Sequence, residues 1–229
     1  MSETVQRFAG GHVDVLAFIV STALLLEYHA FLRAKLRRHP SYTVQAPDGL
    51  ARAAWVETVM AERRDILAVQ TLPNPTMAAS FLASTAVLLI LGVLTLRAQG
   101  DKLGETWHSL NLIGTREPAA RLAKLHMMTA DLFVAFFSFM MAIRVYNHVR
   151  YLINIPVTEK NAVVLPSHVA EFLNRGGGYY YAGQRTFYFL VPLVFFLFGP
   201  HFMLLATCGM IVVLYRVDRA PRALQRDFH

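Results

Sequence analysis

The sequence of 229 residues is 55% hydrophobic and 12% aromatic, with only 16% charged residues and a formal net charge of +7. Soluble domains carry about 45–50% apolar and about 25% charged residues, so this composition points to a membrane protein. The Lys and Arg residues lie beside apolar segments, where anionic lipid head groups are better partners than nucleic acid. We therefore expect an integral protein of the cell membrane, the cytoplasmic membrane in a bacterium, that binds no nucleic acid.

The first two apolar segments have the length of membrane spans. Residues 13–32 would form a helix of about 30 Å, which matches the hydrocarbon thickness of a bilayer, and no small-residue cleavage site follows, so we expect a retained span. The second segment covers residues 75–96, where Asn74 is placed to cap a helix and Pro75 to take its first position. Between them, residues 48–70 have the pattern of an amphipathic helix, which would lie on the membrane surface or pack against its own protein.

Two more apolar segments complete the chain. The third predicted span covers residues 125–150. The segment "GGGYYYAG" (176–183) predicts a flexible turn into a fourth apolar segment, residues 185–215. Gly199 and Pro200 interrupt this fourth segment, which should therefore be broken there. The break is either a sharp kink or a hairpin that gives a fifth short segment. A hairpin would return the basic C-terminal tail to the side of the basic connection after the first span, which the positive-inside rule places in the cytoplasm.

These segments predict an all-α fold. We expect an integral membrane bundle of four long transmembrane helices, the last one broken, forming a single membrane domain over residues 1–229. Successive spans run in opposite directions. The ends of the first and third spans and the starts of the second and fourth should therefore lie at the same membrane face.

Polar side chains gather at that level of the predicted bundle. On the third span, four of them follow the spacing i, i+3, i+4, i+7 and predict one polar stripe of a helix: Arg144, Asn147, His148 and Tyr151. Charged residues within spans usually pair inside a bundle, so Glu27 is expected to pair with Arg144 or Arg185. The same pairing predicts that Arg144→Ala lowers stability more than Asp131→Ala. The candidate binding residues at this level are Glu27, His29, Asn74, Arg144, Asn147, His148 and Arg185, and the candidate structural residues are Pro75, Gly199 and Pro200.

Three interpretations of this polar cluster are open. It can be a lock that orients the helices near the head groups, a binding site or pathway for an ion or small polar solute, or a source of metal or haem ligands in His29, His126 or His148. The histidines lack the paired spacing that makes a metal site specific. The sequence contains no nucleophile elbow, no His-Glu-x-x-His and no carboxylate cluster, so an enzyme is not expected.

Three sequence blocks resemble a known family. They are "TLPNPTMAASFLAS" (71–84), "FFSFMMAIRVYNHVRYLI" (136–153) and "GQRTFYFLVPLVFFLFGP" (183–200). Together they resemble the signature blocks of domain-of-unknown-function family 599, multi-pass membrane proteins of bacteria and plants. The resemblance implies a membrane bundle without an established activity. It also implies that the positions that matter include Asn74, Arg144, Asn147, His148, Arg185, Gly199 and Pro200.

The leading functional prediction is non-enzymatic. We expect the protein to bind or pass an ion or small polar solute through the polar cluster near the cytoplasmic face, without a cofactor, as a homo-oligomer or within a larger membrane complex. The alternative is a structural or accessory subunit of such a complex, for which the cluster is only a lock. The third prediction is a haem- or metal-binding membrane protein.

Overall fold

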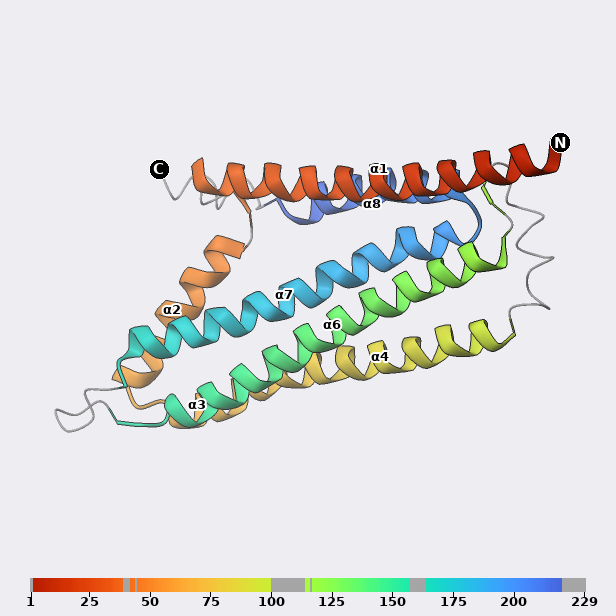
Figure 1. Cartoon of the computed structure of the whole chain (residues 1–229). Helices are drawn as coiled ribbons and strands as arrows, with labels where there is room; N and C mark the ends of the chain where they lie inside the picture. The colour runs from red at the N-terminus through yellow and green to blue at the C-terminus, as the bar shows by residue number, and fades with distance from the viewer. Residues whose placement is uncertain are drawn as a thin grey trace. The chain divides into compact units, whose positions relative to one another are not determined.

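The computed structural model describes residues 2–38, 42–43, 45–99, 114–115, 117–156 and 164–219. Helices account for most of these residues, and no β-strand occurs among them, so the predicted all-α class is confirmed (Figure 1). The helices are α1 (Ser2–Arg38), α2 (Gln45–Ala61), α3 (Asp65–Thr71), α4 (Pro73–Ala98), α6 (Pro118–Leu152), α7 (Pro166–Phe196) and α8 (Pro200–Val217).

Four of the helical stretches are long and apolar enough to cross a membrane, as the sequence predicted. They are Gly10–Leu36 in α1, Asp65–Ala98 in α3 and α4, Pro118–Leu152 in α6, and Pro200–Val217 in α8. The predicted fourth span, residues 185–215, is divided between α7 and α8.

The candidate spans turn many apolar side chains outward. Phe81 on α4 is 73% exposed and Leu205 on α8 is 74% exposed, and Leu16 and Phe137 follow the same pattern on α1 and α6. Soluble monomers rarely expose contiguous apolar surface of this extent. Outward-facing apolar side chains on long apolar helices are what a lipid environment accommodates.

The chain divides into two compact units. Three helices, α4, α6 and α7, contribute residues to both of them, so the division falls within helices and not at linkers. Unit 1 comprises Met1–Tyr42, Leu88–Phe133 and Thr186–His229, and unit 2 comprises Thr43–Val87 and Val134–Arg185.

In unit 1, α1 packs along α8 and both helices run in the same direction (Figure 1). Tyr28 and Leu32 on α1 form a buried cluster with Leu214 on α8. The Tyr28 hydroxyl donates a hydrogen bond of 2.6 Å to the Asp218 carboxylate just beyond α8. The C-terminal end of α8 therefore lies beside Tyr28, about three turns before α1 ends at Arg38.

The Gly199–Pro200 break in unit 1 is a reversal of the chain. α7 ends at Phe196, and Gly199 has φ 144° and ψ 162°, a backbone conformation that favours glycine. Pro200 then occupies the first turn of α8, where its missing N–H has no cost. Figure 1 shows that the chain turns back at this point, so the hairpin is the correct alternative and the kink is not.

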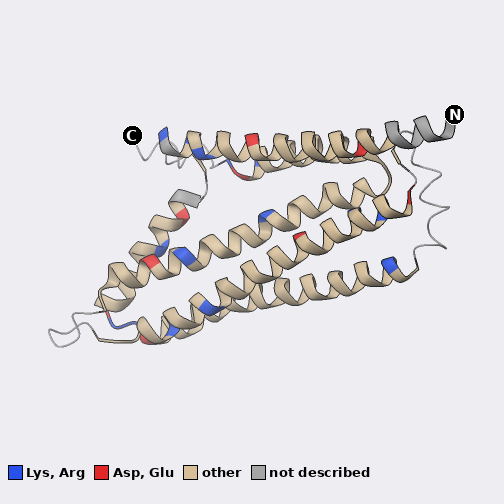
Figure 2. Ribbon diagram, in the orientation of Figure 1, with Lys and Arg blue, Asp and Glu red and all other residues tan. Residues whose placement is uncertain are grey.

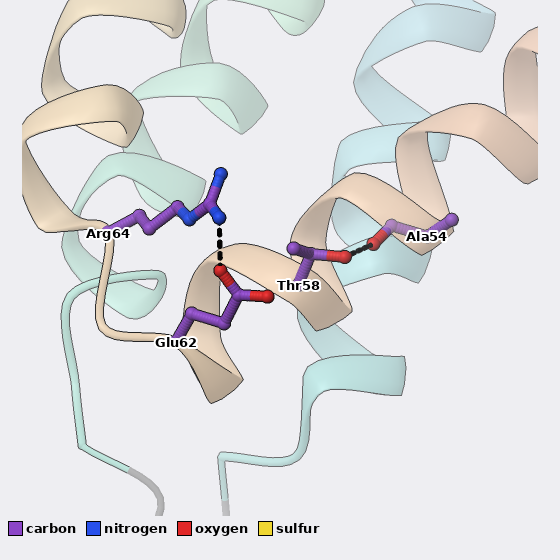
Figure 3. Close-up of polar contacts among 4 residues, drawn as sticks. All are labelled: Ala54, Thr58, Glu62 and Arg64. Carbon is purple, nitrogen blue, oxygen red and sulfur yellow. Dashed lines mark hydrogen bonds and ion pairs between the residues drawn. The ribbon is translucent and has the colours of Figure 1, made fainter.

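In unit 2, the predicted amphipathic helix 48–70 is two helices, because a turn at Glu62–Arg64 separates α2 from α3. Arg63 has φ 55°, and the Arg64 N–H donates to the Val59 carbonyl at 3.0 Å. This is a Schellman C-cap with arginine in the position that usually holds glycine. Figure 3 shows the ion pair between Arg64 and Glu62 at this turn. Ile66 is 76% exposed on α3.

The glycines of α7 lie inside a helix, which corrects the predicted flexible turn. A Cβ atom added to Gly176 would lie 2.8 Å from the Tyr146 ring, and one added to Gly183 would lie 2.7 Å from the Phe139 ring. Both partners lie on α6, one heptad apart, as the glycines do on α7. Glycine is therefore present here because α6 and α7 approach closely, and not because the backbone must bend.

Candidate binding groove

The predicted binding residues are divided between the two units. Glu27 and His29 belong to unit 1, and the others, Asn74, Arg144, Asn147, His148 and Arg185, belong to unit 2. The ion pair expected between Glu27 and an arginine would join the units, and it stays a prediction.

The predicted binding residues of unit 2 have different surroundings. Asn74 is exposed on the first turn of α4, which begins at Pro73, so Asn74 is not the helix cap that the sequence suggested. Arg144 is exposed, and His148 is exposed with its ring edge-on to Phe172 at 5.0 Å. Arg185 lies against the Tyr181 ring, 4.6 Å from its centroid.

Asn147 lies in a groove of about 280 Å³ between α3 and the C-terminal end of α6. The α3 side of the groove is apolar, whereas the α6 side is polar. The lining residues are Ala68, Val69, Leu72, Asn147, Arg150, Tyr151 and Asn154.

The polar residues of the groove form one stripe of α6. Asn147, Arg150 and Tyr151 follow the spacing i, i+3, i+4, which places them on one face of α6, and Asn154 follows in the turn just beyond Leu152. The Asn154 amide donates to the Arg150 carbonyl at 3.1 Å, which fixes the Asn154 side chain on this face. The expected stripe began at Arg144 and included His148; the groove is lined by the stripe that begins one turn later.

A second groove of about 390 Å³ adjoins the first along α4, and Arg150 lines both. Its other lining residues come from the N-terminal part of α4: Pro73, Thr76, Met77, Ser80, Phe81 and Ser84. Arg150 therefore lies where the two grooves meet.

The polar side of the first groove is rich in hydrogen-bond donors. Arg150 carries a guanidinium with five N–H donors, and Asn147 adds an amide with two. No carboxylate is among the lining residues. An arginine with neighbouring amides suits the planar oxygens of a carboxylate or the oxygens of a phosphate.

A model of the family described as proteins of unknown function, DUF599, matches residues 16–223. The chain belongs to the DUF599 family. The match covers both units and the whole groove, and it confirms the resemblance drawn from the three sequence blocks. No curated protein and no solved structure matches the chain.

A buried ion pair in unit 1 of this DUF599 chain was not predicted. Lys124 on α6 forms an ion pair of 2.9 Å with Asp14 on α1, and both side chains are only 7% exposed. The Lys124 ammonium also lies 4.1 Å from the centroid of the Phe196 ring at the end of α7. This contact ties three helices together in a buried position.

A polar contact of unit 2 was missed as well. Arg52 on α2 donates a hydrogen bond of 2.8 Å to the Asn174 side chain on α7, and Asn174 donates one of 3.2 Å to the Gly49 carbonyl. Arg52 stands on the predicted amphipathic helix, but its partner is more than a hundred residues away in the chain. No sequence signal indicates that pairing.

The histidines considered as metal or haem ligands are divided between the two units. His29 and His126 belong to unit 1 and His148 to unit 2. His29 and His126 each place Nδ1 at 2.7 Å from a carbonyl oxygen of their own helix, which leaves Nε2 as the ligating atom. Within the described part of the chain, no group of three or more His, Cys, Asp or Glu side chains could hold a metal ion.

Proposed function

We propose that the protein is a multi-pass membrane protein that binds a small anionic solute in the groove at the end of α6, without chemical conversion of the solute. One observation carries the proposal. Arg150 is exposed in a groove that it shares with Asn147 and Asn154, and none of the lining residues is a carboxylate. Among the described residues, the groove lining therefore offers a positive charge and amide donors and no carboxylate.

The position of the groove favours an anion further. Arg150 and Asn147 lie in the last two turns of the candidate span Pro118–Leu152, and Ala68, Val69 and Leu72 lie in the first turns of the candidate span Asp65–Ala98. The groove is therefore near one end of each span. A guanidinium beside apolar helices is less screened than one in bulk water, which strengthens its attraction to an oxyanion. A membrane face is also where a solute can enter from water.

The test is equilibrium binding of simple anions to the purified chain in nanodiscs of zwitterionic lipid. We expect butyrate or inorganic phosphate to bind, and Arg150→Gln to weaken the binding about tenfold or more, since hydrogen bonds to charged groups contribute roughly 1.5–3 kcal/mol. Arg144→Gln is the matched control, because Arg144 is an exposed arginine on the same helix that does not line the groove. A greater loss in Arg144→Gln would place the solute on the originally expected face of α6.

An accessory role within a larger complex has one supporting observation. On α3, Ile66 is 76% exposed and Val69 is 55% exposed. Exposed apolar side chains at the end of a span can be covered by a second copy of the chain or by another subunit. Light scattering of the detergent-solubilised protein tests this role. A particle larger than one chain, together with no anion binding, would favour the accessory role over the proposed one.

A further inference from the structure

The second groove has a different chemistry from the first. Met77 and Phe81 are its most exposed apolar side chains, at 61% and 73%. The Thr76 hydroxyl donates to the Leu72 carbonyl at 3.0 Å and the Ser80 hydroxyl to the Thr76 carbonyl at 2.9 Å. Their protons are thereby used within α4, so these hydroxyls do not add donors for an anion.

The two grooves together have the polarity of an amphiphile. The first presents the Arg150 guanidinium and the Asn147 amide, and the second continues from Arg150 along an apolar part of α4. We infer that the natural ligand is a single-chain amphiphile, with an anionic head group at Arg150 and an alkyl chain against Met77 and Phe81. This inference rests on the proposed function and narrows its solute to one chemical class.

The placement of the grooves fits this orientation. Phe81 and Met77 lie within the candidate span Asp65–Ala98, whereas Asn147 and Arg150 lie at the end of Pro118–Leu152. The alkyl chain would therefore point along the apolar helix and the head group toward the membrane face. The volume of about 390 Å³ is near the lower end of the range for ligand pockets, which suits one chain and not the two of a bilayer phospholipid.

The experiment compares decanoate with butyrate, which have the same head group. Binding is measured on the full chain in nanodiscs of zwitterionic lipid, with the signal of empty nanodiscs subtracted. We expect decanoate to bind at least about tenfold more tightly, because two or three buried methylene groups suffice for that gain. Phe81→Gln should remove most of the gain and leave butyrate binding unchanged. The matched control is Phe137→Gln, since Phe137 is 61% exposed on α6 and lines neither groove.

The outcomes separate this inference from the proposed function. Equal affinities for butyrate and decanoate would overturn the amphiphile and leave the anion site standing, whereas no binding of either would overturn both. An equal loss in Phe81→Gln and Phe137→Gln would show that decanoate partitions into the lipid without entering the groove. Decanoate binding that survives Arg150→Gln would show that the head group lies elsewhere, and would also overturn the inference.

Discussion

Alanine at Gly183 would meet a ring that cannot move freely. The new Cβ would lie 2.7 Å from Cε1 of Phe139, whereas carbon atoms in contact are normally about 3.5–4.0 Å apart. Phe139 is fully buried, so the ring or the α6–α7 spacing must shift by several tenths of an ångström or more. Overpacking of this kind lowers the free energy of unfolding by roughly 1–3 kcal/mol. The better helix propensity of alanine offsets at most about 1 kcal/mol of that loss.

Gly178 supplies the matched control within the same helix. It is exposed, and a Cβ added there meets nothing within 4 Å, so Gly178→Ala should stabilise by up to about 1 kcal/mol. Thermal unfolding in a mild detergent measures both variants. For a chain of this length about 1 kcal/mol corresponds to roughly 2–4 °C, so Gly178→Ala should melt several degrees above Gly183→Ala.

Two results would refute this reasoning. The first is a melting temperature for Gly183→Ala as high as that for Gly178→Ala. The second is a failure of Phe139→Leu to rescue Gly183→Ala, because a smaller partner should relieve the clash if the ring is its cause. Either result would mean that the glycines serve the backbone and not the packing of α6 on α7.

Three further predictions concern charged residues. Lys124→Met should lower the free energy of unfolding by about 3–5 kcal/mol, because it leaves the Asp14 carboxylate buried without its partner, and Lys124→Met with Asp14→Leu should recover much of that loss in chemical denaturation. Arg144→Ala should change the free energy of unfolding by no more than about 0.5 kcal/mol, since Arg144 is exposed. Asp131→Asn should raise the free energy of unfolding, since one carboxylate oxygen of Asp131 is buried without a hydrogen bond. A fall well beyond about 0.5 kcal/mol for Arg144→Ala would support the ion pair that the sequence predicts for Arg144. Arg63→Gly should stabilise by up to about 1 kcal/mol, because glycine adopts φ 55° without steric cost, and an unchanged or lower melting temperature would count against the strained cap.

The helices that the sequence predicted well are those specified by length and apolarity alone. The predicted spans 13–32, 75–96 and 125–150 lie within α1, α4 and α6, in that order. The hairpin at Gly199–Pro200 was one of two predicted alternatives, and it carried a strong local signal because glycine and proline each restrict the backbone in a known way.

The elements that could not be predicted depend on contacts between distant segments. The turn at Arg63 has no glycine or proline to mark it, and only the positive φ of an arginine defines it. The glycines of α7 looked like a turn because a sequence does not show that Phe139 and Tyr146 would fill the space they leave. Glycine can indicate either flexibility or close packing, and tertiary context decides between them.

The candidate site was predicted in part for the same reason. The periodicity of α6 predicts a polar stripe that includes Asn147 and Tyr151. It does not decide whether the functional stripe continues through Arg144 and His148 or through Arg150. Only the position of α3 decides which stripe lines the groove, and the groove selects Arg150. The Asp14–Lys124 pair was missed because neither residue belongs to a motif and the pairing requires knowing that α1 meets the start of α6.

The direction of the helices in unit 1 bears on which side of the membrane their ends face. α1 and α8 run in the same direction. Both are basic toward their C-terminal ends, where Arg33 and Arg38 belong to α1 and Arg216 and Arg219 lie at and just beyond the last turn of α8. Figure 2 shows Lys and Arg in blue at this end of α1. The positive-inside rule favours the cytoplasm for ends of this kind, so we predict that this end of unit 1 faces the cytoplasm.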